Sequence, residues 1–118
     1  MTHEVIGAAI EVHREMGPGL LEAIYQKCME CELRLRGLTC QHQFHVPLVY
    51  KGEDLDSDLI MDHYFPGQLV VELKAVEKLL PVHDAQLLTY LRLSKTHVGL
   101  LINFNVPVLK NGIKRLVH

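Results

Sequence analysis

The sequence predicts a single α+β or α/β domain over residues 1–118, with a mixed β-sheet flanked by helices in the order ααβββαβ plus a C-terminal hairpin. Three observations support this prediction. Apolar residues recur with the helical period in the N-terminal segment, with a period of two in the middle, and with the helical period again between the later strands. A chain of 118 residues is also long enough to bury one hydrophobic core.

Two helices are expected first. Helical spacing of apolar residues predicts a helix over 4–16, which ends at Gly17-Pro18-Gly19 because the residue before a proline disfavours helical geometry. A second helix is expected over 20–36, with Gly37 providing its stop. The buried stripe of this second helix is expected to contain Leu21, Ile24, Tyr25, Cys28, Cys31 and Leu35.

The rest of the chain predicts mainly strands. Alternating apolar residues up to Tyr50 predict the first strand, and Pro47, which has no N–H for a ladder, places this strand at a sheet edge or at a bulge. The dipeptide Asn111-Gly112 predicts a tight turn in a closing hairpin. The remaining expected elements are strands over 55–64, 69–76 and 97–104 and a helix over 81–95.

Composition excludes several classes of protein. With 48% hydrophobic residues and a formal net charge of -2, the chain is not expected to be disordered, and its net charge gives no global attraction to nucleic acid. No run is long and apolar enough to span a bilayer, and the start lacks the features of a secretory signal, so no membrane association is expected. Three cysteines without signs of an oxidising compartment predict a reduced, cytoplasmic protein.

An unusual pair of charges lies in an otherwise apolar strand. Glu72 and Lys74 are two residues apart and leave the same face of the sheet, which is costly unless they pair or bind something. Strand register decides whether Asp58 joins them. A wide loop centred on Phe65 places Asp58 opposite Glu72, whereas a two-residue loop at Pro66-Gly67 turns Asp58 to the other face. We favour the wide loop, because a trans Pro-Gly pair suits a type II turn, which fits a tight hairpin poorly.

Two carboxylates and a lysine at one point would suit metal-dependent hydrolysis. Mg²⁺ prefers oxygen ligands and typically takes one or two protein carboxylates. The ion would polarise a phosphodiester, while Lys74 positions the nucleophile or stabilises developing charge. The alternative is a structural ion pair of Lys74 with Glu72 or Asp58.

The helix expected over 81–95 carries further candidate site residues. Gln86 and Tyr90 are four residues apart and share a face, and His83 lies three residues before Gln86. A carboxamide and a phenol beside an acidic site could hold a phosphate or the lysine. They could equally be a surface polar group and a core tyrosine.

A second group of residues has the chemistry of zinc ligands. Cys28-Met29-Glu30-Cys31 is a C-x-x-C that is followed by Cys40, His42 and His45. Soft ligands at such spacings can form a zinc site. Cys28 and Cys31, however, lie on the expected apolar stripe of a helix, and no second C-x-x-C exists. We therefore expect buried thiols and no zinc site.

Five blocks of residues occur in order along nearly the whole chain. The blocks are Gly19-Leu20-Leu21-Glu22-Ala23-Ile24-Tyr25, Asp58-Leu59-Ile60, Val71-Glu72-Leu73-Lys74-Ala75, His83-Asp84-Ala85-Gln86-Leu87-Leu88-Thr89-Tyr90-Leu91 and Gly99-Leu100-Leu101-Ile102-Asn103-Phe104. The first block has the form Gly-x-x-Glu-x-x-Tyr. Together the blocks resemble the uncharacterised GxxExxY proteins, which are placed in the PD-(D/E)XK nuclease superfamily.

The resemblance implies a restriction-endonuclease-like core. It implies Asp58 and Glu72 as metal-binding acids, with Lys74 as the catalytic lysine. Glu22 matches the additional acid that such nucleases often use near the metal. The resemblance further implies the Gln-x-x-x-Tyr element of RecB-like members at Gln86 and Tyr90. One departure is Ser57, which stands before Asp58 where the name of the superfamily has a proline.

We therefore expect a Mg²⁺- or Mn²⁺-dependent nuclease that acts on nucleic acid, with DNA as the first candidate. Gln86, Tyr90 and His83 are expected to position the substrate. The alternative function is a non-catalytic module of the same fold that binds nucleic acid or protein. Because a chain of 118 residues has little surface to grip a duplex, we also expect a homodimer or a protein partner.

Overall fold

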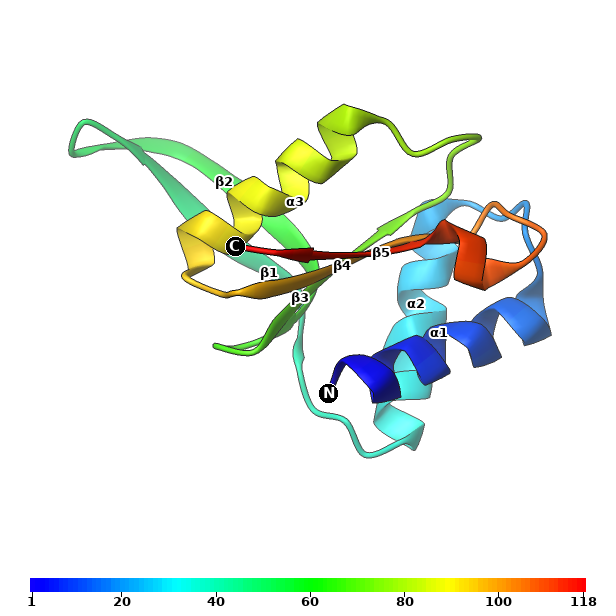
Figure 1. Cartoon of the computed structure of the whole chain (residues 1–118). Coiled ribbons are helices and arrows are strands. Elements are labelled where there is room, and N and C mark those ends of the chain that lie inside the picture. The colour runs from blue at the N-terminus through cyan, green and yellow to red at the C-terminus, as the bar shows by residue number, and fades with distance from the viewer.

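A five-stranded mixed sheet lies between helices in the computed structural model, which describes residues 1–118 (Figure 1). The helices are α1 (Thr2–Met16), α2 (Glu22–Leu35) and α3 (Pro81–Ser94), and a 3₁₀ turn, η1, spans Leu109–Gly112. The strands are β1 (Gln41–Tyr50), β2 (Glu53–Phe65), β3 (Leu69–Lys74), β4 (Val98–Asn103) and β5 (Ile113–Val117). This order confirms the predicted α+β fold class. None of the helices has the length and apolar character that crossing a bilayer requires.

The strands lie in the sheet in their sequence order, β1-β2-β3-β4-β5. All neighbouring pairs are antiparallel except β3 and β4, which are parallel and are connected through α3. β1 is an edge strand, and its register with β2 shifts between Pro47 and Val49. Both observations confirm the placement predicted from the missing N–H of Pro47.

Two hydrophobic clusters cover the sheet. The larger one joins α1 and α2 to β3 and β4, and the smaller one packs α3 against the sheet (Figure 1). Side chains one helical turn apart form the buried face of α2: Tyr25, Met29 and Leu33. The predicted stripe of α2 is therefore wrong in part. Leu21 precedes the helix and is 76% exposed, Leu35 ends it and is 73% exposed, and Cys31 points to solvent.

The predicted hairpin at Asn111-Gly112 does not form. β5 pairs directly with β4, and the dipeptide lies in η1. A two-residue type I′ turn needs a positive φ at both positions, and neither residue has one. A Cβ at Gly112 would clash with the main-chain oxygen of Asn103, so the glycine instead allows η1 to pack against the end of β4.

Candidate active site

The turn between β2 and β3 places Asp62 beside Glu72. Phe65 and Leu69 are the paired residues nearest the turn, and His63 and Val71 are the last paired residues before the two acids. The two strands then separate, and the acidic side chains bridge them. The Asp62 N–H donates to Glu72 Oε1 at 3.0 Å, and the Leu73 N–H donates to Asp62 Oδ2 at 2.8 Å.

Asp58 lies elsewhere, and the prediction that it faces Glu72 is wrong. It pairs with Pro47 of β1, its side chain is 41% exposed, and its Oδ2 lies 3.1 Å from Nδ1 of His45. Residues 66–68 alone form the loop, which is centred on Gly67 with a φ of 74°, so neither the wide loop centred on Phe65 nor the two-residue loop forms. Because the centre of the loop lies two residues further along the chain, the same face of β2 still lies opposite Glu72. The residue opposite Glu72 is now Asp62 instead of Asp58.

The two acids are almost completely buried. Asp62 is 6% exposed and Glu72 is 4% exposed. Gln26 of α2 donates to Asp62 Oδ1 at 2.9 Å, and Gln43 of β1 approaches the same oxygen at 3.5 Å. Sequence reasoning missed Asp62 and Gln26. The available signal for Asp62 was an aspartate that follows Met61 near the end of the expected strand over 55–64.

Burial raises the pKa of both carboxyl groups. The pKa of Glu72 rises to about 9, first through burial and then through the charge of Asp62. The pKa of Asp62 rises to about 6 through burial, against the hydrogen bond from Leu73, and the charge of Glu22 raises it further. The charge of Lys74 lowers both pKa values but does not offset burial. The pair thus retains a proton at neutral pH and would gain free energy from an added cation.

Lys74, Gln86 and Tyr90 gather beside the acids. Lys74 Nζ donates to Gln86 Oε1 at 3.2 Å. Tyr90 is 5% exposed, and burial raises its pKa to about 12, with smaller contributions from the charges of Glu72 and Asp62. α3 therefore brings two of its three predicted site residues, Gln86 and Tyr90, to the end of β3.

His83 has a different place from the one expected. Its Nδ1 accepts a hydrogen bond from the Leu80 N–H at 2.9 Å, which satisfies a free donor at the start of α3. The imidazole is thereby held at the helix end. We therefore do not assign substrate positioning to His83.

Glu22 is the first residue of α2, and Tyr25 fixes this end of the helix. The Tyr25 hydroxyl donates to the Gly17 carbonyl at 2.5 Å and accepts from the Leu20 N–H at 3.2 Å. Its fully buried ring stacks on Phe104, with centroids 4.5 Å apart. The glutamate of the Gly-x-x-Glu-x-x-Tyr signature thus lies where its charge raises the pKa of Asp62 and Glu72, and the tyrosine holds it there.

Asn103 fixes the course of the chain after Lys74. It is 2% exposed, its Nδ2 donates to the Val76 carbonyl at 2.9 Å, and its Oδ1 accepts from the Val76 N–H at 3.1 Å. Sequence reasoning missed this role, because it depends on the parallel pairing that places Asn103 beside Lys74.

One comparison with known proteins identifies a family. A model of the PD-(D/E)XK nuclease superfamily matches residues 1–116. The chain belongs to this superfamily. Searches of the curated proteins and of the solved structures each found no match. Glu72-Leu73-Lys74 has the (D/E)XK form of the superfamily name, and the buried Asp62 lies beside Glu72.

Proposed function

We propose that the protein is a Mg²⁺- or Mn²⁺-dependent nuclease of the GxxExxY type that hydrolyses phosphodiester bonds in nucleic acid, with DNA as the first candidate substrate. One observation carries the proposal. Two buried carboxylates, Asp62 and Glu72, meet where β2 and β3 separate, and Lys74 lies on the same strand as Glu72. Membership of the PD-(D/E)XK nuclease superfamily supports this reaction class.

The donor set fits a hard divalent cation. Asp62 and Glu72 offer only oxygen, and Glu72 Oε2 makes no hydrogen bond within the protein. Burial raises both pKa values, and the charge of Lys74 lowers them but does not offset burial. Asp62 and Glu72 would hold the ion, with Glu22 at the border of the site. When bound, Mg²⁺ polarises the scissile phosphate and lowers the pKa of water.

The remaining residues would handle charge and orientation. The ammonium of Lys74 would attract a phosphate oxygen and orient the attacking water, and Gln86 holds this ammonium through its Oε1. Tyr90 keeps its proton at neutral pH, since its pKa is about 12, so its hydroxyl remains a hydrogen-bond donor. In these roles the residues would hold the substrate between the end of β3 and α3.

Lys74→Ala is the first test. We expect it to slow Mg²⁺-dependent cleavage by about 10²-fold, because it removes the charge that orients water and phosphate. Cleavage is measured on labelled single- and double-stranded DNA and RNA, with EDTA as the metal-free control. Lys78→Ala, which removes an exposed lysine close in sequence, is the matched control and should cleave like wild type. A wild-type protein that binds but never cuts any of these substrates, with Mg²⁺ or Mn²⁺, would contradict the proposal and favour the binding module.

The proposal also covers the cellular setting. Cys28, Cys31 and Cys40 are all free thiols, which supports a reducing compartment such as the cytoplasm. The small size of the chain supports action as a homodimer or with a protein partner, which would extend the surface that grips a duplex.

A further inference from the structure

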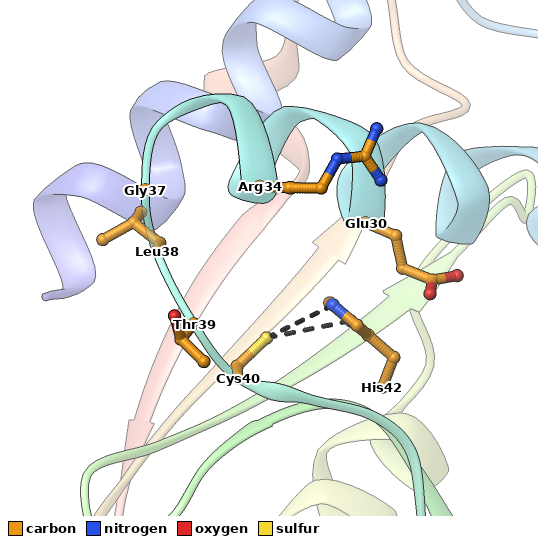
Figure 2. Close-up of a pocket in the computed structure, with 7 residues that line it drawn as sticks. All are labelled: Glu30, Arg34, Gly37, Leu38, Thr39, Cys40 and His42. Atoms are coloured by element: carbon orange, nitrogen blue, oxygen red, sulfur yellow. Dashed lines mark hydrogen bonds between the residues drawn. The ribbon is translucent and has the colours of Figure 1, made fainter.

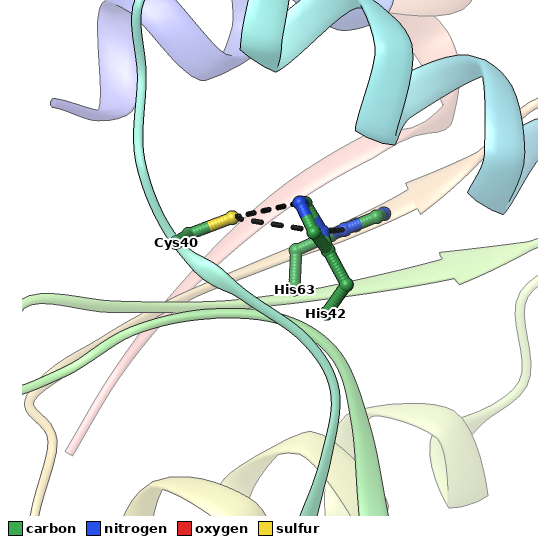
Figure 3. Close-up of side chains that lie close together, drawn as sticks. All are labelled: Cys40, His42 and His63. Atoms are coloured by element: carbon green, nitrogen blue, oxygen red, sulfur yellow. Dashed lines mark hydrogen bonds between the residues drawn. The ribbon is translucent and has the colours of Figure 1, made fainter.

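Cys40, His42 and His63 form a second cluster of metal-binding side chains, separate from the carboxylates. Cys40 lies immediately before β1, His42 lies in β1, and His63 lies in β2 (Figure 3). His42 and His63 are direct partners in the antiparallel register of the two strands. One potential ligand atom from each of the three residues lies within 4.8 Å of the others.

The distances in this cluster are close to those of a tetrahedral zinc site. Cys40 Sγ lies 3.7 Å from Nδ1 and 3.9 Å from Nε2 of His42. Zn–S and Zn–N bonds of about 2.3 and 2.0–2.1 Å hold sulfur and nitrogen about 3.5 Å apart at a tetrahedral angle. The Nδ1 atoms of His42 and His63 are 2.8 Å apart. An ion between them would need this separation to open by about 0.5 Å.

One nitrogen atom of the cluster has no hydrogen-bond partner in the protein. His63 is fully buried, and its Nε2 has no hydrogen-bond partner. An unsatisfied buried polar atom of this kind is uncommon and costly. The contact with His42 uses Nδ1 of His63, so an ion between the two Nδ1 atoms would replace that contact and leave Nε2 as it is.

An open hollow adjoins the cluster on the side of α2. It has a volume of about 280 Å³, and Cys40, His42 and Glu30 are among its lining residues (Figure 2). An ion held by three protein ligands would therefore have a route to solvent. Water would complete a four-coordinate shell.

We propose that Cys40, His42 and His63 bind one Zn²⁺ ion at this point. A thiolate and two imidazoles are ligands that zinc prefers, whereas Mg²⁺ prefers the oxygen pair at Asp62 and Glu72. The proposal goes beyond the nuclease function and does not depend on it. It also revises the expectation that the chain has no zinc site. The cysteines of the C-x-x-C are not ligands, since Cys31 is exposed and Cys28 lines a different hollow with it.

The position of the ion suggests a structural role. It would join the segment before β1 to β2, at the edge of the sheet. His63 follows Asp62 directly in β2, and Gln43, which follows His42, approaches Asp62 Oδ1. An ion that fixes His42 and His63 would therefore also hold Gln43 and Asp62, the residues next to them in the chain, in place.

Titration of the full chain with Co²⁺ tests the proposal. Co²⁺ replaces Zn²⁺ in tetrahedral sites and has an intense visible spectrum there, with an additional thiolate-to-metal band when cysteine is a ligand. We expect one Co²⁺ per chain with this thiolate band, displaced by one equivalent of Zn²⁺. Cys40→Ser should lose the thiolate band and weaken Zn²⁺ binding at least about tenfold. Cys31→Ser is the matched control, because it removes an exposed thiol, and should bind like wild type.

Two further measurements distinguish metal binding at this site from metal binding at the carboxylates. Asp62→Asn should retain the Co²⁺ spectrum, and excess Mg²⁺ should not displace Co²⁺. Binding that survives Cys40→Ser unchanged, that lacks a thiolate band, or that disappears in Asp62→Asn would overturn the proposal. Because Cys40 is half-buried, circular dichroism of Cys40→Ser is recorded alongside. If this variant is unfolded, His42→Gln takes its place, with the same expected loss of binding.

Discussion

Asp62→Asn is expected to reduce Mg²⁺-dependent cleavage by about 10³-fold, whereas Asp58→Asn should leave the rate within about twofold of wild type. The reason is the register of β2. Asp62 is buried beside Glu72, while Asp58 is exposed at the outer part of the hairpin and contacts His45. The measurement is single-turnover cleavage of a labelled substrate at saturating Mg²⁺.

The two aspartate variants form a matched pair, because both make the same chemical change in the same strand. In Asp62→Asn, the amide oxygen of the new side chain can still accept a hydrogen bond from the Leu73 N–H, so the fold should persist. Equal losses in both variants, or a larger loss in Asp58→Asn, would show that the site has been placed at the wrong end of β2.

Glu72→Gln is expected to stabilise the metal-free protein at pH 8 by about 1–3 kcal/mol, even though it should abolish cleavage. Burial raises the pKa of Glu72 in the folded state from 4.5 to about 9. Between these values the folded state binds more protons than the unfolded state, so its stability falls as pH rises. A neutral glutamine removes this loss of stability, and its side-chain oxygen can still accept a hydrogen bond from the Asp62 N–H.

Urea unfolding in EDTA at several pH values between about 5 and 9 measures this effect. Wild type should lose stability across this range, and Glu72→Gln should show a smaller slope. Glu77→Gln, which changes an exposed glutamate, controls for the loss of one negative charge. A variant that is less stable than wild type at pH 8 would indicate that Glu72 is charged and well compensated in the folded protein.

The sequence was sufficient to predict the three helices, the first four strands and half of the acidic site. Glu72 and Lys74 could be placed because their spacing within one strand fixes their common face. The partner aspartate could not be placed, because it depends on where the chain turns. Phe65 is the last residue of β2 and pairs with Leu69, and this detail of the turn decides between Asp58 and Asp62.

Contacts between distant segments explain the other differences. His63 joins Cys40 and His42 only through the pairing of β1 with β2, so the spacing of the cysteines gave no indication of it. Asn111-Gly112 has the composition of a hairpin turn, but close packing of Gly112 against Asn103 determines its conformation. His83 was assigned to the site from helical spacing, whereas the start of α3 requires a hydrogen-bond acceptor there.

The location of a bound divalent ion is decisive for the acidic site. Crystals soaked in Mn²⁺ give an anomalous signal that marks the ion regardless of activity. We expect a peak between the carboxylates of Asp62 and Glu72. A peak beside Asp58 and His45, or no peak near Glu72 at millimolar Mn²⁺, would contradict this placement of the metal.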